Sequence, residues 1–190
     1  MPNLVEKRLK VRFKSLSPVL FCKPVLGVEK AGETPDQTEQ RTWKERAHYD
    51  DEGKVVIPGY MIQSALEPAA KLLNKRVGGK KMGKSLAHYI RLVRIEDDIV
   101  TNITRENIEG ITAFVSANGK EGGGKVMRTY PKIGIWEGTL TLVYPNLTEL
   151  CDNVILEHFE VAGLCVGIGH WRPGAPSKGS YGRFSVEKVG

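Results

Sequence analysis

Two glycine-rich, basic segments of the sequence have the composition of phosphate-binding loops. The first, residues 78–85, reads GGKKMGKS and matches the pattern G-x-x-x-x-G-K-[ST], in which backbone amides and a lysine hold phosphates. That mechanism needs a buried strand before the loop and a helix after it, whereas the pattern here is helical before the loop and strand-like after it. We therefore interpret the segment as a cationic loop that meets a phosphate backbone through Lys80, Lys81 and Lys84.

The second segment, residues 167–183, combines glycines with basic and aromatic residues. Glycines let a backbone approach a ligand closely, and cationic side chains contact phosphates. Exposed aromatic rings stack on unpaired bases at about 1–3 kcal/mol per base. The residues of this segment that we predict to contact nucleic acid are His170, Trp171, Arg172, Lys178, Tyr181 and Arg183.

The distribution of charge also favours a polyanionic partner. The net charge is +6, and residues 68–95 contain eight lysines and arginines but no acidic residue. A field segregated in this way concentrates counter-ions on one surface. The alternative is a solvated face without a partner, which is the more common role of a charge run.

The four histidines are the candidates for acid–base chemistry. His158 lies on an amphipathic helical pattern and His88 in a strand-like one, so we expect structural roles for both. His48 and His170 lie in predicted loops and could reach a ligand. The three cysteines are scattered, and no zinc, haem, flavin or nicotinamide motif is present, so we expect no metal and no cofactor.

Hydrophobic periodicity predicts an α+β fold around these segments. We expect strands at residues 5–16, 86–95, 133–144 and 183–189, and helices at residues 60–74 and 147–162. Pro68 should kink or interrupt the first helix, because proline lacks a backbone donor. A long loop follows the first strand over residues 23–54, and a hairpin-like insertion occupies residues 97–132, with its tip at residues 122–124. The order is the βαββαβ of a ferredoxin-like, or RRM-like, fold that ends in a glycine-rich loop and a strand.

The length of 190 residues indicates a single domain spanning residues 1–190. No apolar run approaches the roughly 20 residues needed to span a bilayer. The N-terminal residues alternate apolar and charged types and lack the apolar stretch of a signal peptide. We therefore expect a cytoplasmic protein with no membrane partner.

Two of these passages together resemble the RAMP superfamily of CRISPR-associated proteins. The sequence IPG at residues 57–59 opens a helix, and the pattern G-x-G … G-x-Y-G-R-F follows near the C-terminus. The likeness is greatest to the backbone subunits that coat the guide RNA. It covers the two ends and the element order, and the insertion at residues 97–132 corresponds by position to the family's thumb-like hairpin. The short length is similar to that of a solitary member encoded by a phage.

The resemblance implies a protein that binds single-stranded nucleic acid, with RNA favoured over DNA as the partner, and that is not an enzyme. It also implies self-association along the nucleic acid. One alternative is a metal-independent endoribonuclease, because some RAMP proteins cut RNA with a histidine; His170 and His48 are the candidates here. Some backbone subunits use a loop aspartate instead, and the residue most similar in position is Asp36. A further alternative is a phage protein that mimics a CRISPR subunit and binds CRISPR-complex or host proteins.

Overall fold

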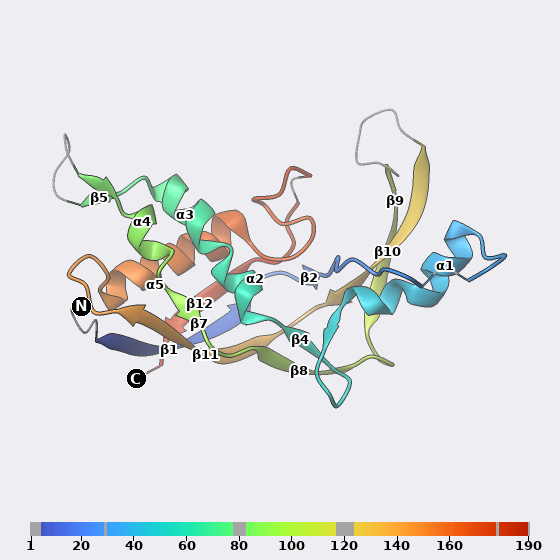
Figure 1. Ribbon diagram of the computed structural model, residues 1–190, viewed down its shortest axis with the longest axis horizontal. Helices are drawn as coiled ribbons and strands as arrows, with labels where there is room; N and C mark the ends of the chain where they lie inside the picture. The colour runs from blue at the N-terminus through green and yellow to red at the C-terminus, as the bar shows by residue number, and fades with distance from the viewer. Residues whose placement is uncertain (1–4, 29, 78–82, 117–123, 178, 190) are drawn as a thin grey trace.

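The computed structural model describes residues 5–28, 30–77, 83–116, 124–177 and 179–189. The molecule is elongated, with a helix-covered sheet at one end and a projecting β-hairpin at the other (Figure 1). All strand pairings are antiparallel. The helices and strands together confirm the predicted mixed fold. Among the described residues, no helix is long and apolar enough to cross a membrane.

The main sheet has four strands in the order β12-β1-β11-β7. Its members are β1 (Glu6–Ser15), β7 (Arg94–Ile95), β11 (Glu137–Pro145) and β12 (Phe184–Lys188). In β1, Leu9, Val11 and Phe13 are buried, whereas the residues between them are exposed. Because successive side chains of a strand point to opposite faces, β1 gives the sheet an apolar inner face and a basic outer face.

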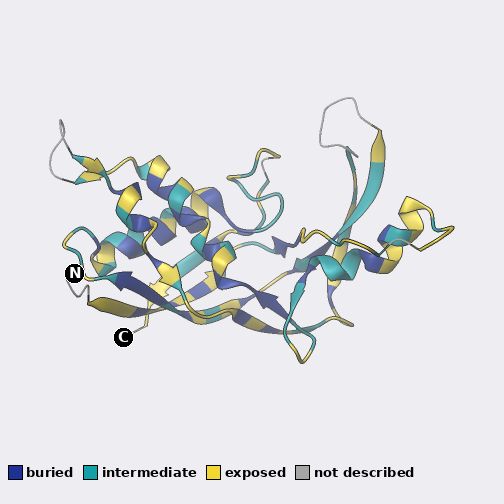
Figure 2. Ribbon diagram, viewed as in Figure 1, coloured by how far each residue is buried: buried dark blue, intermediate teal, exposed yellow. Residues whose placement is uncertain are grey.

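Five helical segments cover the inner face of this sheet (Figure 1). They are α2 (Gly59–Gln63), α3 (Leu66–Leu73), α4 (Ala87–Ile90), α5 (Asp152–Val161) and the π-helical turn η2 (Ala162–Val166). The core lies between these helices and the sheet, where Figure 2 shows buried residues concentrated. Phe13 of β1 packs edge-on against Phe159 of α5, with ring centroids 5.3 Å apart.

The helix predicted for residues 60–74 is divided in a different place from the one expected. The break between α2 and α3 falls at Ser64 and Ala65, before Pro68. Pro68 is the third residue of α3, in the first turn, where a backbone N–H has no acceptor within the helix. The proline therefore removes no helical hydrogen bond and does not kink the helix.

The strand predicted for residues 86–95 is wrong over most of its length. Residues 87–90 form α4, and only the two residues of β7 pair with β11. The buried residues are Leu86, Ala87, Ile90 and Val93. Their spacing of three to four residues is helical, and it outweighs the local alternation on which the strand was predicted.

The long loop predicted for residues 23–54 is also wrong, because half of it has regular structure. It contains α1 (Pro35–Thr42), the 3₁₀ turn η1 (Trp43–Arg46) and β3 (His48–Tyr49). Thr34 and Gln37 form a capping box at the start of α1, in which each side chain bonds the other residue's backbone N–H. The sequence signal was present, since Thr followed three residues later by Gln is a helix-start pattern.

The projecting hairpin consists of β9 (Glu109–Ser116) and β10 (Lys125–Ile133). Their register is continuous, and β2 (Val19–Leu20) pairs with the base of β10. The predicted tip of the hairpin falls on residues 122 and 123, which lie outside the described residues, and on Gly124. The strand predicted to begin at residue 133 begins instead at Glu137, because Ile133 still belongs to β10.

The remaining strands form two small sheets. β3 pairs with β4 (Lys54–Ile57), and β4 pairs with β8 (Ile99–Thr104) through an irregular register. β5 (Arg76–Val77) and β6 (Lys84–Ser85) pair with each other; β5 directly precedes the glycine-rich motif at residues 78–85, and β6 forms its last two residues. A motif that ends in a strand is unlike the strand-then-helix arrangement of a nucleoside-triphosphate loop.

The C-terminal glycine-rich loop, residues 167–183, is held by close backbone contacts within the protein. Gly182 has φ +69°, and a Cβ there would lie 1.8 Å from the carbonyl oxygen of Ile168. The Ile168 N–H donates to the Gly182 carbonyl at 2.9 Å, and the Gly182 N–H donates to Pro18 at 2.7 Å. Glycine is therefore required at this position by both the space and the backbone conformation.

We expect Gly182→Ala to destabilise the protein by at least about 2 kcal/mol, because the new methyl group meets a backbone carbonyl and the left-handed conformation is strained. Gly134→Ala is the matched control, since a Cβ at Gly134 has no heavy atom within 4 Å. Chemical denaturation of both variants measures the difference. Equal stabilities would contradict the tight packing of the loop.

Candidate nucleic-acid interface

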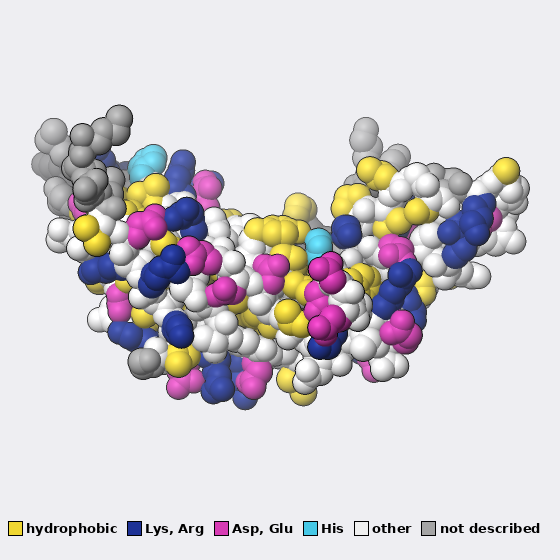
Figure 3. Space-filling view, turned by 60° about the horizontal axis from the view of Figure 1, so that its bottom comes forward, with side chains coloured by type: hydrophobic (Ala, Val, Ile, Leu, Met, Phe, Trp, Pro, Cys, Tyr) yellow, Lys and Arg dark blue, Asp and Glu magenta, His cyan; other side chains and the backbone are white. Residues whose placement is uncertain are grey.

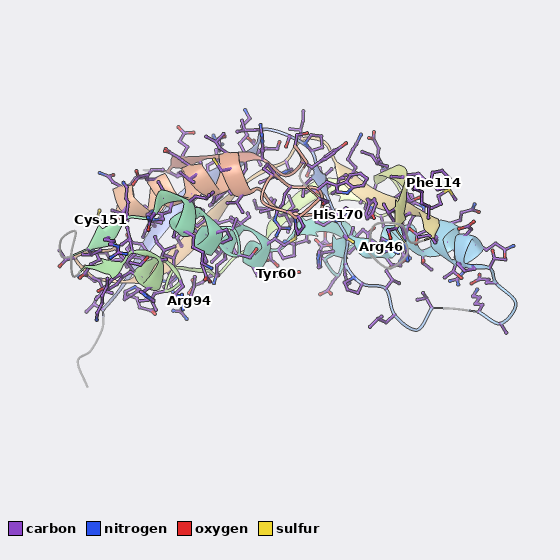
Figure 4. All side chains as sticks on the ribbon, turned by 90° about the horizontal axis from the view of Figure 1, so that it is seen from above. Arg46, Tyr60, Arg94, Phe114, Cys151 and His170 are labelled. Atoms are coloured by element: carbon purple, nitrogen blue, oxygen red, sulfur yellow. The ribbon has the colours of Figure 1, made fainter. Side chains whose placement is uncertain are left out.

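A cleft of about 410 Å³ lies where three distant parts of the chain meet. One wall is the segment after β2, which contributes Lys23; the second comes from β3 and α2, with His48 and Tyr60; the third is the glycine-rich loop, with His170 and Arg172. In the view from above, Tyr60 and His170 lie near the middle of the molecule (Figure 4). The cleft therefore lies between the helix-covered sheet and the hairpin.

Backbone contact between the glycine-rich loop and β2 positions the third wall. The His170 N–H donates to the Leu20 carbonyl at 2.8 Å. Gly169 has φ +75°, and a Cβ there would lie 2.4 Å from the same oxygen. The Arg172 side chain is held by the same loop, because its Nη1 donates to the Gly169 carbonyl at 3.0 Å. The loop thus carries His170 and Arg172 to the cleft on a fixed backbone.

The His170 ring is part of an aromatic cluster at the base of the hairpin. It stacks on Tyr130 of β10, with ring centroids 4.4 Å apart and an interplanar angle of 23°. The centroid of the Trp171 ring lies 5.1 Å from the centroid of each of these two rings and 6.2 Å from that of Tyr181. The Nε2 atom of His170 is buried and has no hydrogen-bond partner among the described residues. The cluster therefore fixes the orientation of the imidazole ring and covers its Nε2 atom.

His48 and Tyr60 form a pair on the opposite side of the cleft. The Tyr60 hydroxyl lies 3.3 Å from the Nε2 atom of His48, and the two rings meet edge-on. Tyr60 is 61% exposed, whereas tyrosine residues in proteins are on average more buried. An exposed aromatic ring at the edge of a basic cleft can stack on an unpaired base.

The charge of the cleft is positive. Lys23 and Arg172 are the ionised side chains among its described lining residues, and none of those residues is acidic. Burial lowers the pKa of His170 below its ordinary value of 6.5, and the charges of Arg172 and Arg46 lower it further. Burial and the charge of Lys23 likewise lower the pKa of His48, against the opposing effect of Asp98. Both histidines are therefore neutral at pH 7.

A buried carboxylate fastens the hairpin and α1 to this region. Glu39 of α1 accepts hydrogen bonds from Arg46 at 2.8 Å, from Arg128 of β10 at 3.1 Å and from the Thr129 N–H at 2.8 Å. Burial opposes ionisation of Glu39, but these bonds and the two arginine charges outweigh it, so the pKa is lowered. The charged carboxylate holds β10 in place and with it Tyr130, on which His170 stacks.

The structure brings together some of the residues predicted to form the site. His48, His170 and Arg172 line one cleft, and Trp171 and Tyr181 lie in the adjoining aromatic cluster. Trp171 and Tyr181 were predicted to stack on bases. Their rings contact other aromatic side chains of the protein, and both are half-buried, so base stacking by them stays a prediction.

Other predicted residues lie elsewhere. Arg183 is exposed just before β12, and Asp36 is exposed in the first turn of α1; neither lines the cleft. Lys84 lies in β6, which Figure 1 shows at the end of α3 remote from the glycine-rich loop. Lys80, Lys81 and Lys178 lie outside the described residues. Residues 78–82 of the first glycine-rich segment lie outside the described residues, so the predicted joint grip of the two segments stays a prediction.

Sequence reasoning missed Lys23 and Tyr60. Lys23 begins the segment that was predicted to be a long loop, and Tyr60 was assigned to the helix without regard to its exposure. A signal was available for Tyr60, because it follows the helix-opening residues 57–59 and lies off the apolar face of α2. For Lys23 the sequence holds no such signal.

The comparisons with known proteins find similarity in structure and none in sequence. No family model and no curated protein matches the sequence. The structure is similar to a chain in the cryo-EM structure of type III-B Cmr-beta bound to cognate target RNA, with a TM-score of 0.54 and 12% identity over 96% of this chain. This protein spans 61% of the length of that chain.

Two further structures match with lower TM-scores. The crystal structure of Cmr6 from Pyrococcus furiosus is 13% identical, with a TM-score of 0.47 over 97% of this chain and 99% of Cmr6. A chain of a CRISPR RNA-guided surveillance complex is 9% identical, with a TM-score of 0.36 over 87% of this chain and 64% of that one. The fold that this protein shares, at a TM-score above 0.5, is that of the chain in the type III-B Cmr-beta structure, a mixed α/β fold with antiparallel sheets.

Proposed function

We propose that the protein binds single-stranded RNA as a CRISPR-subunit-like component of a ribonucleoprotein, with the cleft as part of its RNA interface. The observation that carries this proposal is the composition of the cleft. Two cations, two neutral histidines and an exposed tyrosine line it, and no acidic residue does. The fold shared with an RNA-bound Cmr-beta chain supports the same class of partner.

Each type of side chain in the cleft has a role in such binding. Lys23 is exposed and makes none of the ion pairs formed within the described residues, so its charge is free for a phosphate. Tyr60 offers a ring for stacking. The hydroxyl of Tyr60 can bond a base edge or a ribose hydroxyl, which is how proteins select RNA.

The strand order supports a ferredoxin-like core as the scaffold of this site. Counting β1, β7, β11 and β12 as the four strands, their spatial order is four-one-three-two, and all are antiparallel. Helices α2 and α3 connect the first two strands, and α5 connects the last two. We propose that residues 1–190 form one such domain and that residues 97–132 are its inserted lobe.

Replacing Lys23 should weaken RNA binding through the loss of one phosphate contact. We expect Lys23→Ala to lower the affinity for a single-stranded oligoribonucleotide. It should also make the slope of log association constant against log salt concentration shallower by about one. Fluorescence anisotropy titrations at several salt concentrations measure both quantities. Tyr60→Ala should lower the affinity by about 1–3 kcal/mol and leave the salt dependence unchanged, because it removes stacking and no charge.

Lys10→Ala is the matched control for these titrations. Lys10 is an exposed lysine on the outer face of β1, away from the helices and the cleft, so its loss should leave the affinity within twofold. An equal loss of affinity in Lys10→Ala and Lys23→Ala would indicate a diffuse charge effect and contradict the cleft. No binding at low salt would overturn the proposed function itself.

The pair of His48 and Tyr60 favours metal-independent RNA cleavage as a second candidate function. A histidine that is neutral at pH 7 can take a proton from a ribose 2′-hydroxyl, and a second group can donate one to the leaving oxygen. His170 lies across the same cleft, with its Nε2 unpaired. Asp36 lies outside the cleft, so this candidate rests on the histidines.

Incubation of labelled RNA with the protein in excess EDTA tests this candidate. We expect cleavage that is lost in His48→Ala and retained in Asp36→Asn, with a rate that rises with pH through a point below 6.5. The lowered pKa of His48 sets that position, because the base must be neutral to act. RNA that stays intact at every pH would reject cleavage and leave RNA binding unaffected.

A further inference from the structure

We propose that β9 is an interface through which two copies of this chain pair as antiparallel strands. The hairpin of β9 and β10 projects from the body of the molecule (Figure 1), and β9 is the edge strand of the sheet β2-β10-β9. Within the described residues β9 pairs with β10 alone. An edge of this kind presents unpaired N–H and C=O groups that another strand can bind.

The direction of these backbone groups follows from the partners of β10. The Thr129 N–H donates to Glu39, and the Pro131 carbonyl accepts from the Phe21 N–H at 2.9 Å, so both residues point away from β9. In an antiparallel pair, residues directly opposite one another either exchange both bonds or neither. Gly110 and Thr112, which lie opposite them, therefore point outward, and so does Phe114 by alternation.

The sequence of β9 lacks the features that protect edge strands from pairing. Natural edges are short, bulged, or interrupted by proline and charge. β9 has eight residues, EGITAFVS, with no proline and with Glu109 as its one charge, and its register with β10 is continuous. By contrast, the edge strand β12 has five residues and includes Glu187 and Lys188, and β8 pairs with β4 through an irregular register.

The hairpin of β9 and β10 also exposes apolar side chains. Phe114 is 73% exposed, and Figure 4 shows it at the end of the molecule away from the main helices. Figure 3 shows hydrophobic side chains on the surface at this end. A two-stranded ribbon is marginally stable alone in water, and apolar residues on both of its faces gain stability when another strand covers them.

A second copy of the chain fits this edge because β9 is complementary to itself. In an antiparallel pair centred on Ala113, Thr112 of each copy faces Phe114 of the other and exchanges both backbone hydrogen bonds with it. On the other side of the ribbon, Ile111 faces Val115. Such pairs of β-branched or aromatic residues stabilise a ladder by about 0.2–1 kcal/mol each.

The charges of β9 do not oppose the same arrangement. Its one charged residue, Glu109, forms an ion pair with Lys132 of β10 at 2.8 Å. The uncharged residues 110–115 bring no like charges together when two copies pair.

Sedimentation of the protein freed of nucleic acid, over a range of concentrations, tests this interface. We expect a reversible monomer–dimer equilibrium for the unchanged chain. Phe114→Pro removes an outward N–H without removing a bond to β10, since proline is tolerated on an edge where its nitrogen faces solvent. It should weaken dimerisation at least tenfold, because each dimer loses two such donors.

Phe114→Ser and Ile135→Ser form a matched pair for the side-chain contribution. Ile135 is 83% exposed and lies outside the hairpin, so its loss should leave the dimer unchanged, whereas Phe114→Ser should weaken it. Circular dichroism of each variant verifies the fold. A monomeric chain at every concentration, or a dimer unaffected by Phe114→Pro, would overturn the proposal.

The outcome is distinguishable from that of RNA binding by the cleft. The affinity of Phe114→Pro for a short oligoribonucleotide should equal that of the unchanged chain, because Phe114 does not line the cleft. A monomeric chain whose RNA affinity falls in Phe114→Pro would show that RNA, and not a second copy, covers β9. That result would overturn the dimer and leave the proposed function standing.

Discussion

The close backbone contact between the glycine-rich loop and β2 is the constraint on which the candidate site depends. Gly169 approaches the Leu20 carbonyl too closely for any side chain, and the His170 N–H bonds that same oxygen. Through this contact, residues from the C-terminal part of the chain meet those that follow β2. Without it, His170 and Arg172 would have no fixed relation to His48 and Tyr60.

A second constraint acts from the opposite side of the same region. The ionised Glu39 joins α1, η1 and β10 through two arginines and a backbone N–H. β10 in turn carries Tyr130, whose ring supports His170. The cleft is thus bounded by a glycine-dependent contact and a buried charge cluster, so its shape is set by the fold and does not depend on a ligand.

The sequence predicted the strands of the main sheet well where alternation was clear. β1 and β12 lie within one residue of their predicted bounds. The amphipathic pattern located α5, but the helix begins at Asp152, five residues after its predicted start. The strand predicted at residues 86–95 failed because a short helix with buried residues three to four apart also fits a ten-residue window. The capping box of α1 was visible in the sequence and was not used.

The candidate site was predictable only in part. Aromatic and basic residues near glycines indicated the loop at residues 167–183, but not that its glycines serve contacts within the protein. The stacking of Tyr130 on His170 and its tilted contact with Trp171 could not be predicted, because the register of a long insertion depends on tertiary pairing. The same applies to Lys23, which reaches the cleft only through the fold.

The measurement that tests the account most directly is photo-crosslinking of the protein to single-stranded RNA, followed by identification of the modified residues by mass spectrometry. RNA bound in the cleft predicts crosslinks at Tyr60 and in the segments at residues 21–24 and 168–172, which line it. Crosslinks confined to the outer face of β1, or to the β5–β6 hairpin, would contradict the cleft as the RNA interface.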